Sequence, residues 1–267
     1  AATWRWRDAH RAHSISLAPE KMFTMEWNAR LSELILVTRN ASVYAWNPTT
    51  LTPRTLRRGG TSDAITVNLV ADAASGAVAL YGRSSSGASA FAEIHHQDRI
   101  VVLPKQTSGL LTAQFSRDGE RLAAGRVDGT VVVWDAQSGS ERNAFSGHLG
   151  LVYGIAWSHD GTLLAWAGDD SNIHVWNSES DTRLIMKGHA SKVNGLLFPG
   201  ADNYLYSWSN DDSIRVWETQ RGILVASLLH GGMVSRFESN SAHLRSVSAS
   251  TLGTMKVWQL DPGRCLH

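Results

Sequence analysis

The sequence predicts an all-β fold, a β-propeller of six or seven four-stranded blades, on three observations. Tryptophans recur at a nearly constant interval, each at the end of a short β-branched or apolar run. Asp-Gly turns connect runs that have the composition of neighbouring strands. Four short strands fit into each unit of about 40 residues, which is the length of one propeller blade. Such a unit cannot bury both of its faces alone, whereas units stacked around an axis can.

The repeat is clearest in the second half of the chain. Four tryptophans follow one another at intervals of 42, 41 and 41 residues: Trp134, Trp176, Trp217 and Trp258. Counting back by a similar interval reaches Ala92 and then Trp46. Residues 25–46 align without a gap on residues 155–176, which supports a first repeat there. We therefore expect six repeats, of which the second is the least regular.

The strands within one repeat can be assigned from the residues around its hairpin turn. Residues 151–157 predict a strand, residues 158–161 a tight turn, and residues 163–167 the next strand. The pairs Asp118-Gly119 and Asp160-Gly161 are strong hairpin signals, because glycine tolerates the positive φ that such turns require. The outer strands are expected to begin about seven residues after the repeat tryptophan, near Glu141 and Arg183.

Composition limits the classes of partner. The 25 Lys and Arg against 24 Asp and Glu give a formal charge of +1, which argues against nucleic acid or anionic lipid as a direct ligand. No apolar run approaches the roughly 18 residues of a membrane-spanning helix, so no membrane insertion is expected. The single cysteine, Cys265, cannot form an internal disulfide, which favours a reducing intracellular compartment, with the cytoplasm as the default.

The pattern resembles the WD40-repeat family over nearly the whole chain, most strongly over residues 109–259. Trp134-Asp135 is a literal Trp-Asp pair at the end of a repeat. His148 and His189 each follow a glycine and lie 28 positions before a repeat tryptophan, as the family's Gly-His element does. The resemblance implies a single WD40-type propeller over residues 1–267 that needs no cofactor.

The resemblance also implies a buried hydrogen-bond network in each blade, formed by histidine, serine or threonine, aspartate and tryptophan. Such a chain satisfies its own buried polar groups and fixes strand register. Only the fifth repeat is complete, because Trp166 replaces the hydroxyl in the fourth and Leu252 replaces the aspartate in the sixth. The expected network residues are His189, Ser207, Asp211 and Trp217 in the fifth repeat, His148, Asp170 and Trp176 in the fourth, His230, Ser248 and Trp258 in the sixth, and Asp128 and Trp134 in the third.

The histidine, serine and aspartate of the fifth repeat could instead form a nucleophilic triad. His189, Ser207 and Asp211 have the side chains of a triad. Their repeat phase favours the network, and no strained turn presents the serine to solvent. We therefore predict no catalytic residues.

Two further ligand classes are considered and disfavoured. The histidine pairs at 10 and 13 and at 95 and 96 lack a cysteine or carboxylate cluster at ligand spacing, so no metal is expected. Residues 4–7 alternate tryptophan and arginine, as a platform for single-stranded nucleic acid does. Because Trp6 lies 40 residues before Trp46, another repeat strand is the better interpretation.

These observations predict a non-catalytic protein-interaction scaffold within a multiprotein assembly, with other proteins rather than small molecules as partners. The alternative is a reader of a modified peptide or of a ubiquitin-like partner at the central channel. A propeller enzyme would need a carboxylate cluster or a metal at the channel mouth. The family's channel entrance is lined by residues before the blade aspartate and at the start of the innermost strand. The matching partner-binding candidates are Asp169, Asn210, Ser191, Lys192 and Arg39.

Strand counting leaves the ring incomplete. Residues 2–6 are typical of a seventh third strand, without two strands before them. By the interval of the regular repeats, the outer strand of the sixth blade would start near Cys265. We expect these residues to be an excerpt of a longer chain, or to depend on neighbouring chain for closure. Alternatively, residues 13–17 supply that outer strand and close six blades.

Overall fold

The computed structural model describes residues 22–38, 42–47, 49–50, 53–58, 65–72, 74–84, 90–97, 99–104, 106, 108–200, 203–240 and 245–259. The regular secondary structure in these ranges consists of β-strands, which are arranged in six antiparallel sheets. Each sheet is a meander in which neighbours in sequence are neighbours in space. The first three sheets contain β1 (Met22–Asn28), β2 (Glu33–Thr38), β3 (Val43–Trp46) and β4 (Pro53–Arg57); β5 (Ile65–Ala71), β6 (Val78–Ser84), β7 (Ala90–His95) and β8 (Ile100–Val102); and β9 (Leu110–Phe115), β10 (Arg121–Arg126), β11 (Val131–Asp135) and β12 (Glu141–Phe145).

The remaining three sheets repeat this order. They contain β13 (Val152–Trp157), β14 (Leu163–Gly168), β15 (Ile173–Asn177) and β16 (Thr182–Met186); β17 (Val193–Leu197), β18 (Tyr204–Ser209), β19 (Ser213–Glu218) and β20 (Ile223–Leu229); and β21 (Val234–Asn240), β22 (Arg245–Ser250) and β23 (Met255–Gln259). The predicted repeat is confirmed, because Trp46, Ala92 and the four regular tryptophans all lie in the third strand of a sheet.

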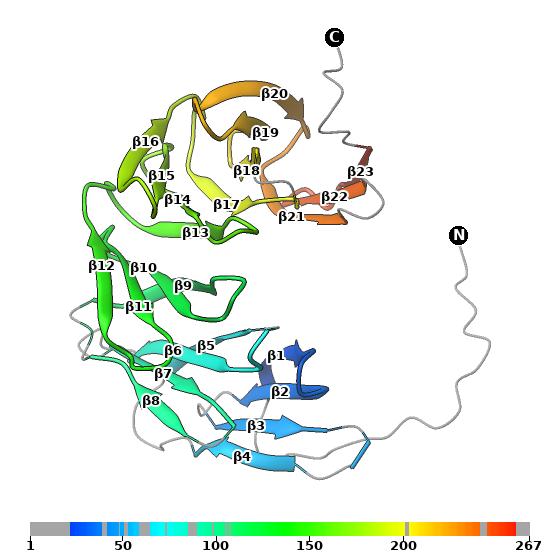
Figure 1. Cartoon of the computed structure of the whole chain (residues 1–267). Helices are drawn as coiled ribbons and strands as arrows, with labels where there is room; N and C mark the ends of the chain where they lie inside the picture. Colours follow the sequence, from blue (N-terminus) through cyan, green and yellow to red (C-terminus); the bar gives the residue numbers. More distant parts are fainter. Residues whose placement is uncertain are drawn as a thin grey trace, which may run out of the picture.

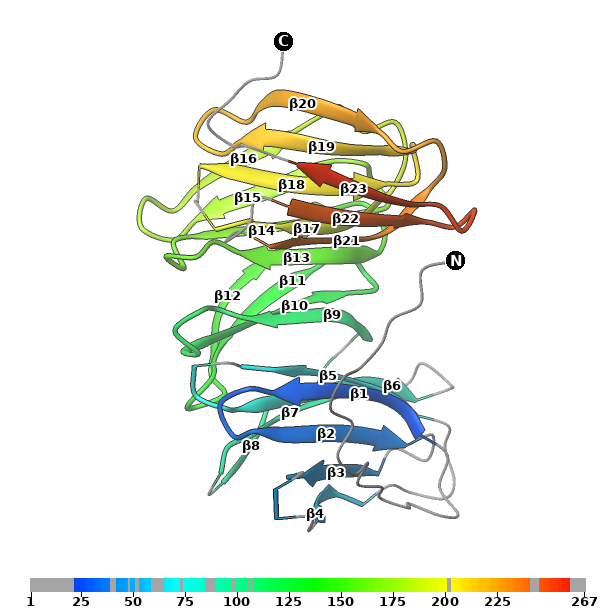
Figure 2. The same ribbon diagram turned by 90° about the vertical axis from the view of Figure 1, so that its right-hand side faces the viewer.

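The sheets follow one another as the blades of a propeller (Figure 1). Their first strands, β1, β5, β9, β13, β17 and β21, are the inner strands, and each packs on the next. Among the described residues β21 and β1 do not pack in this way, and they face each other across the open side of the arc (Figure 1). The view turned by 90° looks onto the open side of the arc, with the sixth sheet in front above and the first sheet in front below (Figure 2).

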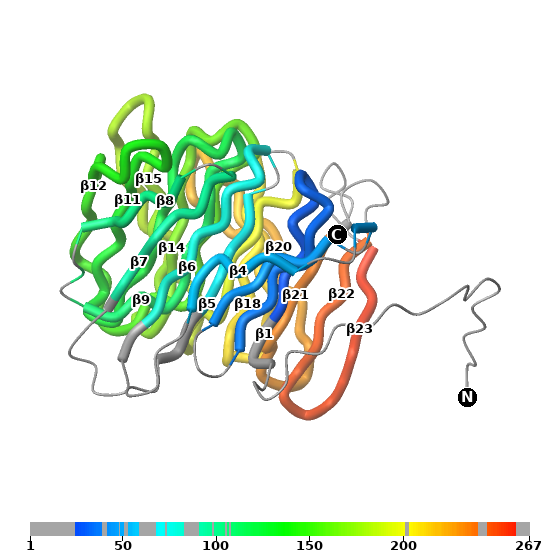
Figure 3. Tube along the Cα trace, turned by 90° about the horizontal axis from the view of Figure 1, so that it is seen from below, coloured from blue at the N-terminus to red at the C-terminus, as the bar shows by residue number. Residues whose placement is uncertain are grey.

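The strands run between two sets of connections (Figure 3). We call the end that carries the Asp-Gly turns the turn end, and the opposite end, where each inner strand begins, the loop end. The hairpin turns form as predicted, with φ of +71° at Gly119 and +74° at Gly161. The outer strands β12 and β16 begin at Glu141 and Thr182, at or next to the predicted positions.

The hydrophobic core is divided between successive sheets, because side chains alternate along each strand. In β11, Val131 and Val133 belong to a cluster with the fourth sheet, whereas Val132 and Trp134 belong to a cluster with the second. Three further clusters join the first sheet to the second, the fourth to the fifth, and the fifth to the sixth. Each sheet therefore depends on its neighbours for burial of its two faces.

The sixth sheet differs from the others in having three strands within the described residues. Its last strand exposes apolar side chains, with Met255 at 71% and Val257 at 73% exposure. On the other side of the opening, Trp27 of β1 is 49% exposed. The segments at residues 2–6 and 13–17, which were considered for ring closure, lie outside the described residues.

Candidate protein-interaction site

In the fifth sheet the structure brings together all four expected network residues. His189 Nδ1 lies 2.7 Å from Asp211 Oδ2, and His189 Nε2 lies 2.7 Å from Ser207 Oγ. The Trp217 indole N–H donates to the same hydroxyl oxygen at 2.8 Å. Asp211 also accepts the backbone N–H groups of Ala190 and Ser213. The chain of contacts therefore joins the loop before β17 to strands β18 and β19.

The protonation states of this network follow from its burial. Burial lowers the pKa of His189, although the hydrogen bond to Asp211 opposes the shift. Burial alone would raise the pKa of Asp211, but hydrogen bonds from Ser213, Ala190 and His189 hold it at about 2. A neutral imidazole beside a charged carboxylate requires Nδ1–H to donate to Asp211, which leaves Nε2 to accept the Ser207 hydroxyl proton.

Triad chemistry does not fit this geometry, although the distances resemble those of a triad. Ser207 is fully buried, and its oxygen already accepts the Trp217 indole N–H. A nucleophile must reach a substrate carbonyl, and this hydroxyl has no exposed surface from which to do so. The contacts of the three side chains are those of a structural network.

The fourth sheet replaces the network with an aromatic stack. The Trp176 indole N–H donates to Asp181 at 2.9 Å rather than to a strand hydroxyl. Trp166 lies between Phe145 and His174, with ring centroids 5.1 and 5.5 Å away. One carboxylate oxygen of Asp170 forms a hydrogen bond with His174 Nε2 at 3.0 Å. His148 Nε2 lies 3.0 Å from the other Asp170 oxygen, but without hydrogen-bond geometry.

The third and sixth sheets hold only fragments of the expected network. Trp134 is fully buried and its indole N–H has no hydrogen-bond partner among the described residues, while Asp128 caps the backbone N–H of Thr130. In the sixth sheet the Trp258 indole N–H donates to Ser248 at 2.7 Å. His230 is buried, and within the part of the chain that the structure describes neither of its ring nitrogens has a hydrogen-bond partner. The aspartate that would accept from it is absent, since Leu252 occupies that position.

At the loop end, β-bulges place one extra residue near the start of the inner strands. In β13 Val152 pairs with Gly168 and Gly154 with Ala167, so Tyr153 is unpaired. The same interruption isolates Asn194 in β17, and both residues lie 23 positions before their repeat tryptophan. Bulges commonly re-aim a side chain beside a functional site.

The bulged residues meet three of the predicted partner-binding residues, and together they form what we call the entrance cluster: Tyr153, Asp169, Lys192, Asn194 and Asn210. Lys192 Nζ lies 4.8 Å from the centre of the Tyr153 ring. Burial and then the negative charge of Asp169 raise the pKa of the Tyr153 hydroxyl. Asn194 Nδ2 donates to Asn210 Oδ1 and to the backbone carbonyl of Val234, each at 2.7 Å. The cluster thus extends across the fourth, fifth and sixth sheets.

The other two predicted partner-binding residues differ in what the structure says of them. Ser191 lies next to Lys192, and its carbonyl oxygen accepts the Ser209 hydroxyl at 3.1 Å. Arg39 lies outside the described residues.

A group of three histidine, cysteine or acidic side chains able to hold a metal does not occur among the residues that the structure describes. The described ranges also include no helix with the length and apolar character of a membrane span.

The repeat architecture can be compared with known proteins. The family model described as "WD domain, G-beta repeat" matches residues 97–135, 139–177 and 181–218. The chain contains three WD40 repeats. Each matched WD40 repeat joins the outer strand of one sheet to the first three strands of the next, so that residues 139–177 contain β12 through β15. Consecutive WD40 repeats therefore interlock neighbouring blades.

Curated WD40 relatives match parts of the chain. It is 31% identical to "Apoptotic protease-activating factor 1" of Danio rerio over 139 residues, which are 50% of this chain and 11% of that protein. It is 30% identical to "Protein HIR1" of Mycosarcoma maydis over 138 residues, 45% of this chain and 14% of that protein. It is 27% identical to "Nuclear distribution protein PAC1-2" of Uncinocarpus reesii over 194 residues, 63% of this chain and 41% of that protein. The chain spans less than half the length of these relatives.

A solved structure has the same fold. The chain resembles one from the "Crystal Structure of Mitotic Checkpoint Complex" with a TM-score of 0.72 and 17% sequence identity, covering 98% of this chain and 86% of that one.

The fold positions several residues at the loop end that sequence reasoning missed. Tyr153 and Asn194 were missed, although their fixed offset from the repeat tryptophan could have revealed them. Exposed apolar residues of the loop end were also missed: Leu149, Met233 and Leu252.

Proposed function

We propose that the chain is a non-catalytic WD40 scaffold, one propeller over residues 1–267, which holds partner proteins at its loop end. The entrance cluster is the observation that carries this proposal. It combines an aromatic ring, a cation, an exposed carboxylate and two amides on two inner strands and the loop residues next to strand ends. Leu149, Met233 and Leu252 add exposed apolar contacts at the same end. Aromatic and apolar anchors beside polar groups are typical of protein interfaces.

The comparisons support a role in assemblies at the level of the family. The solved relative belongs to a structure described as a complex, and the residues that match HIR1 and PAC1-2 make up 14% and 41% of those larger proteins. The single cysteine supports a reducing compartment such as the cytoplasm. The absence of an exposed nucleophile in the fifth-sheet network favours binding over catalysis.

Quantitative affinity purification of the full chain tests the proposal. Asp169→Ala and Lys192→Ala should each deplete the bound partners several-fold, because both remove charges from the entrance cluster. Glu179→Ala is the matched control, since Glu179 is an exposed carboxylate in a turn at the opposite end. Retention of the same partners by the entrance variants, or equal loss with Glu179→Ala, would contradict the proposed site.

A further inference from the structure

A pocket lies at the turn end of the arc, opposite the entrance cluster. Its volume is about 570 Å³, within the range of ligand sites, and it is formed where the inner strands end. Glu26, Gln114 and Trp157 reach it from β1, β9 and β13. Trp157 lies six positions after Leu151 of the loop end, which corresponds to about 20 Å of strand. The two ends of the arc therefore present separate sites.

Two carboxylates, Glu26 and Asp72, line one wall of this pocket, and Asp72 already accepts the backbone N–H and the hydroxyl of Ser75. The Glu26 carboxylate accepts the backbone N–H of Ala71 at 3.1 Å, and it forms no ion pair within the described part of the chain. Burial raises the pKa of Glu26, as expected for a carboxylate without a neighbouring cation. Burying a charge is costly unless an opposite charge compensates it, so an arriving cation would be favoured here.

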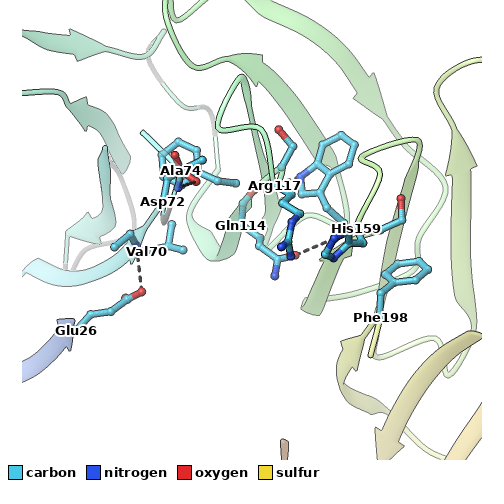
Figure 4. Close-up of a pocket in the computed structure, with 13 residues that line it drawn as sticks. Glu26, Val70, Asp72, Ala74, Gln114, Arg117, His159 and Phe198 are labelled. Atoms are coloured by element: carbon cyan, nitrogen blue, oxygen red, sulfur yellow. Dashed lines mark hydrogen bonds between the residues drawn. The ribbon is translucent and has the colours of Figure 1, made fainter. Parts of the chain in front are cut away.

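The opposite wall has a different character. Arg117 and His159 lie across the pocket from Glu26 (Figure 4). Arg117 is exposed, and its neighbour Asp118 pairs with Arg121 at 3.5 Å instead. Phe198 lies beside His159 on the side of the pocket away from Glu26 (Figure 4), and together with Trp157 it adds apolar surface to the lining. This distribution fits a ligand with an apolar stem, a cationic group and a nearby anionic group.

We propose that this pocket binds a short segment of a partner polypeptide whose lysine or arginine side chain pairs with Glu26 and whose nearby acidic side chain faces Arg117. The aliphatic stem of the basic residue would pack on Trp157 and Phe198, as long cationic side chains do on apolar surface. The inference extends the proposed scaffold function, because a second partner segment could bind while the entrance cluster is occupied.

The test uses the full chain and defined synthetic peptides, acetyl-Lys-(Gly)n-Glu-amide with n from 1 to 4, which vary the distance between the charges. Binding is followed by NMR at the indole N–H of Trp157, which lies in the pocket and donates to the Gln114 carbonyl. Glu26→Gln keeps an acceptor for Ala71 while removing the charge. It should raise the Kd of the best peptide by about three- to tenfold.

Matched variants separate this site from other causes. Glu33→Gln removes a carboxylate from the same sheet that already pairs with Arg54 at 2.8 Å, and it should leave the Kd unchanged. Asp169→Ala at the loop end should also leave the Kd of the peptide unchanged. Failure of the scaffold proposal at the entrance cluster can therefore be told apart from failure of this pocket to bind the peptide. Replacing the peptide lysine by alanine should weaken binding to the original chain but not to Glu26→Gln. Equal binding of both peptides to the original chain, or no Trp157 response at millimolar peptide, would overturn the inference.

Discussion

At the residue scale, the fifth and third sheets contain the same buried tryptophan in two chemical settings. The Trp217 indole N–H donates to Ser207, whereas the Trp134 indole N–H has no hydrogen-bond partner in the described ranges. Both rings are almost fully buried, so their apolar contributions are comparable. The difference in unfolding free energy between variants at these two tryptophans should therefore report the contribution of the hydrogen bond.

Trp217→Phe should destabilise the chain by about 1–2 kcal/mol more than Trp134→Phe. Both substitutions remove a similar volume, but Trp134→Phe also removes an unsatisfied buried donor, which offsets part of the loss. Urea unfolding of the two variants gives the comparison. Equal losses would mean that the bond to Ser207 contributes nothing measurable.

Asp211→Ala should lower the free energy of unfolding by about 1–3 kcal/mol, because it leaves His189 buried without its acceptor. Asp169→Ala should cost much less, since that carboxylate is exposed and its hydrogen bond from the Leu151 N–H can be replaced by water. Thermal unfolding of both variants checks the difference. An unchanged midpoint for Asp211→Ala would remove the network assignment, and equal losses would mean that the repeat phase is misplaced.

At the element scale, the sixth blade lacks the aspartate that completes the fifth. His230 and Leu252 lie 41 positions after His189 and Asp211, so the two blades are directly comparable. The missing acceptor explains why both His230 ring nitrogens are unpaired. This blade should be the more easily opened of the two.

Leu252→Asp should stabilise the chain by about 1–2 kcal/mol, because it provides His230 with an acceptor and replaces an exposed leucine. The gain should disappear in a His230→Phe background, and calorimetry of the four combinations measures this coupling. A gain that persists without His230 would show that removal of the exposed leucine alone is responsible.

Sequence reasoning reached the strands and their repeat, because tryptophan spacing and Asp-Gly turns are local signals. The resemblance also identified the fifth-blade residues that the structure brings together. It could not identify the replacement of hydrogen bonds by the Trp166 stack, which depends on Phe145 from the preceding blade. The bulges at Tyr153 and Asn194 likewise arise from strand register, which alternation of side chains does not mark.

At the scale of the whole molecule, the six sheets of the described residues form an arc with an open side rather than a closed ring. Met255 and Val257 are exposed on β23, and Met25 and Trp27 are exposed on β1. Exposed apolar surface beside an unpaired strand edge favours association with another chain.

We therefore expect residues 1–267 to associate reversibly as the concentration rises, as measured by sedimentation velocity. Replacing Met255 and Val257 by lysine should suppress this association. Ile185→Lys is the control, since Ile185 is half-exposed on the outer strand β16. A monomer at every concentration would support closure of the ring within this chain, and equal suppression by Ile185→Lys would exclude the open side as the contact.

The central claim, that partners bind at the loop end, is tested most directly by position-specific crosslinking. In a Cys265→Ser background, Leu149→Cys at the loop end and Val102→Cys on outer strand β8 each carry a benzophenone probe. The two sites are matched in exposure, at 77% and 74%. The account predicts partner crosslinks from position 149 that are lost on Lys192→Ala, and few from position 102. Crosslinks of equal yield from both positions, or from position 102 alone, would contradict it.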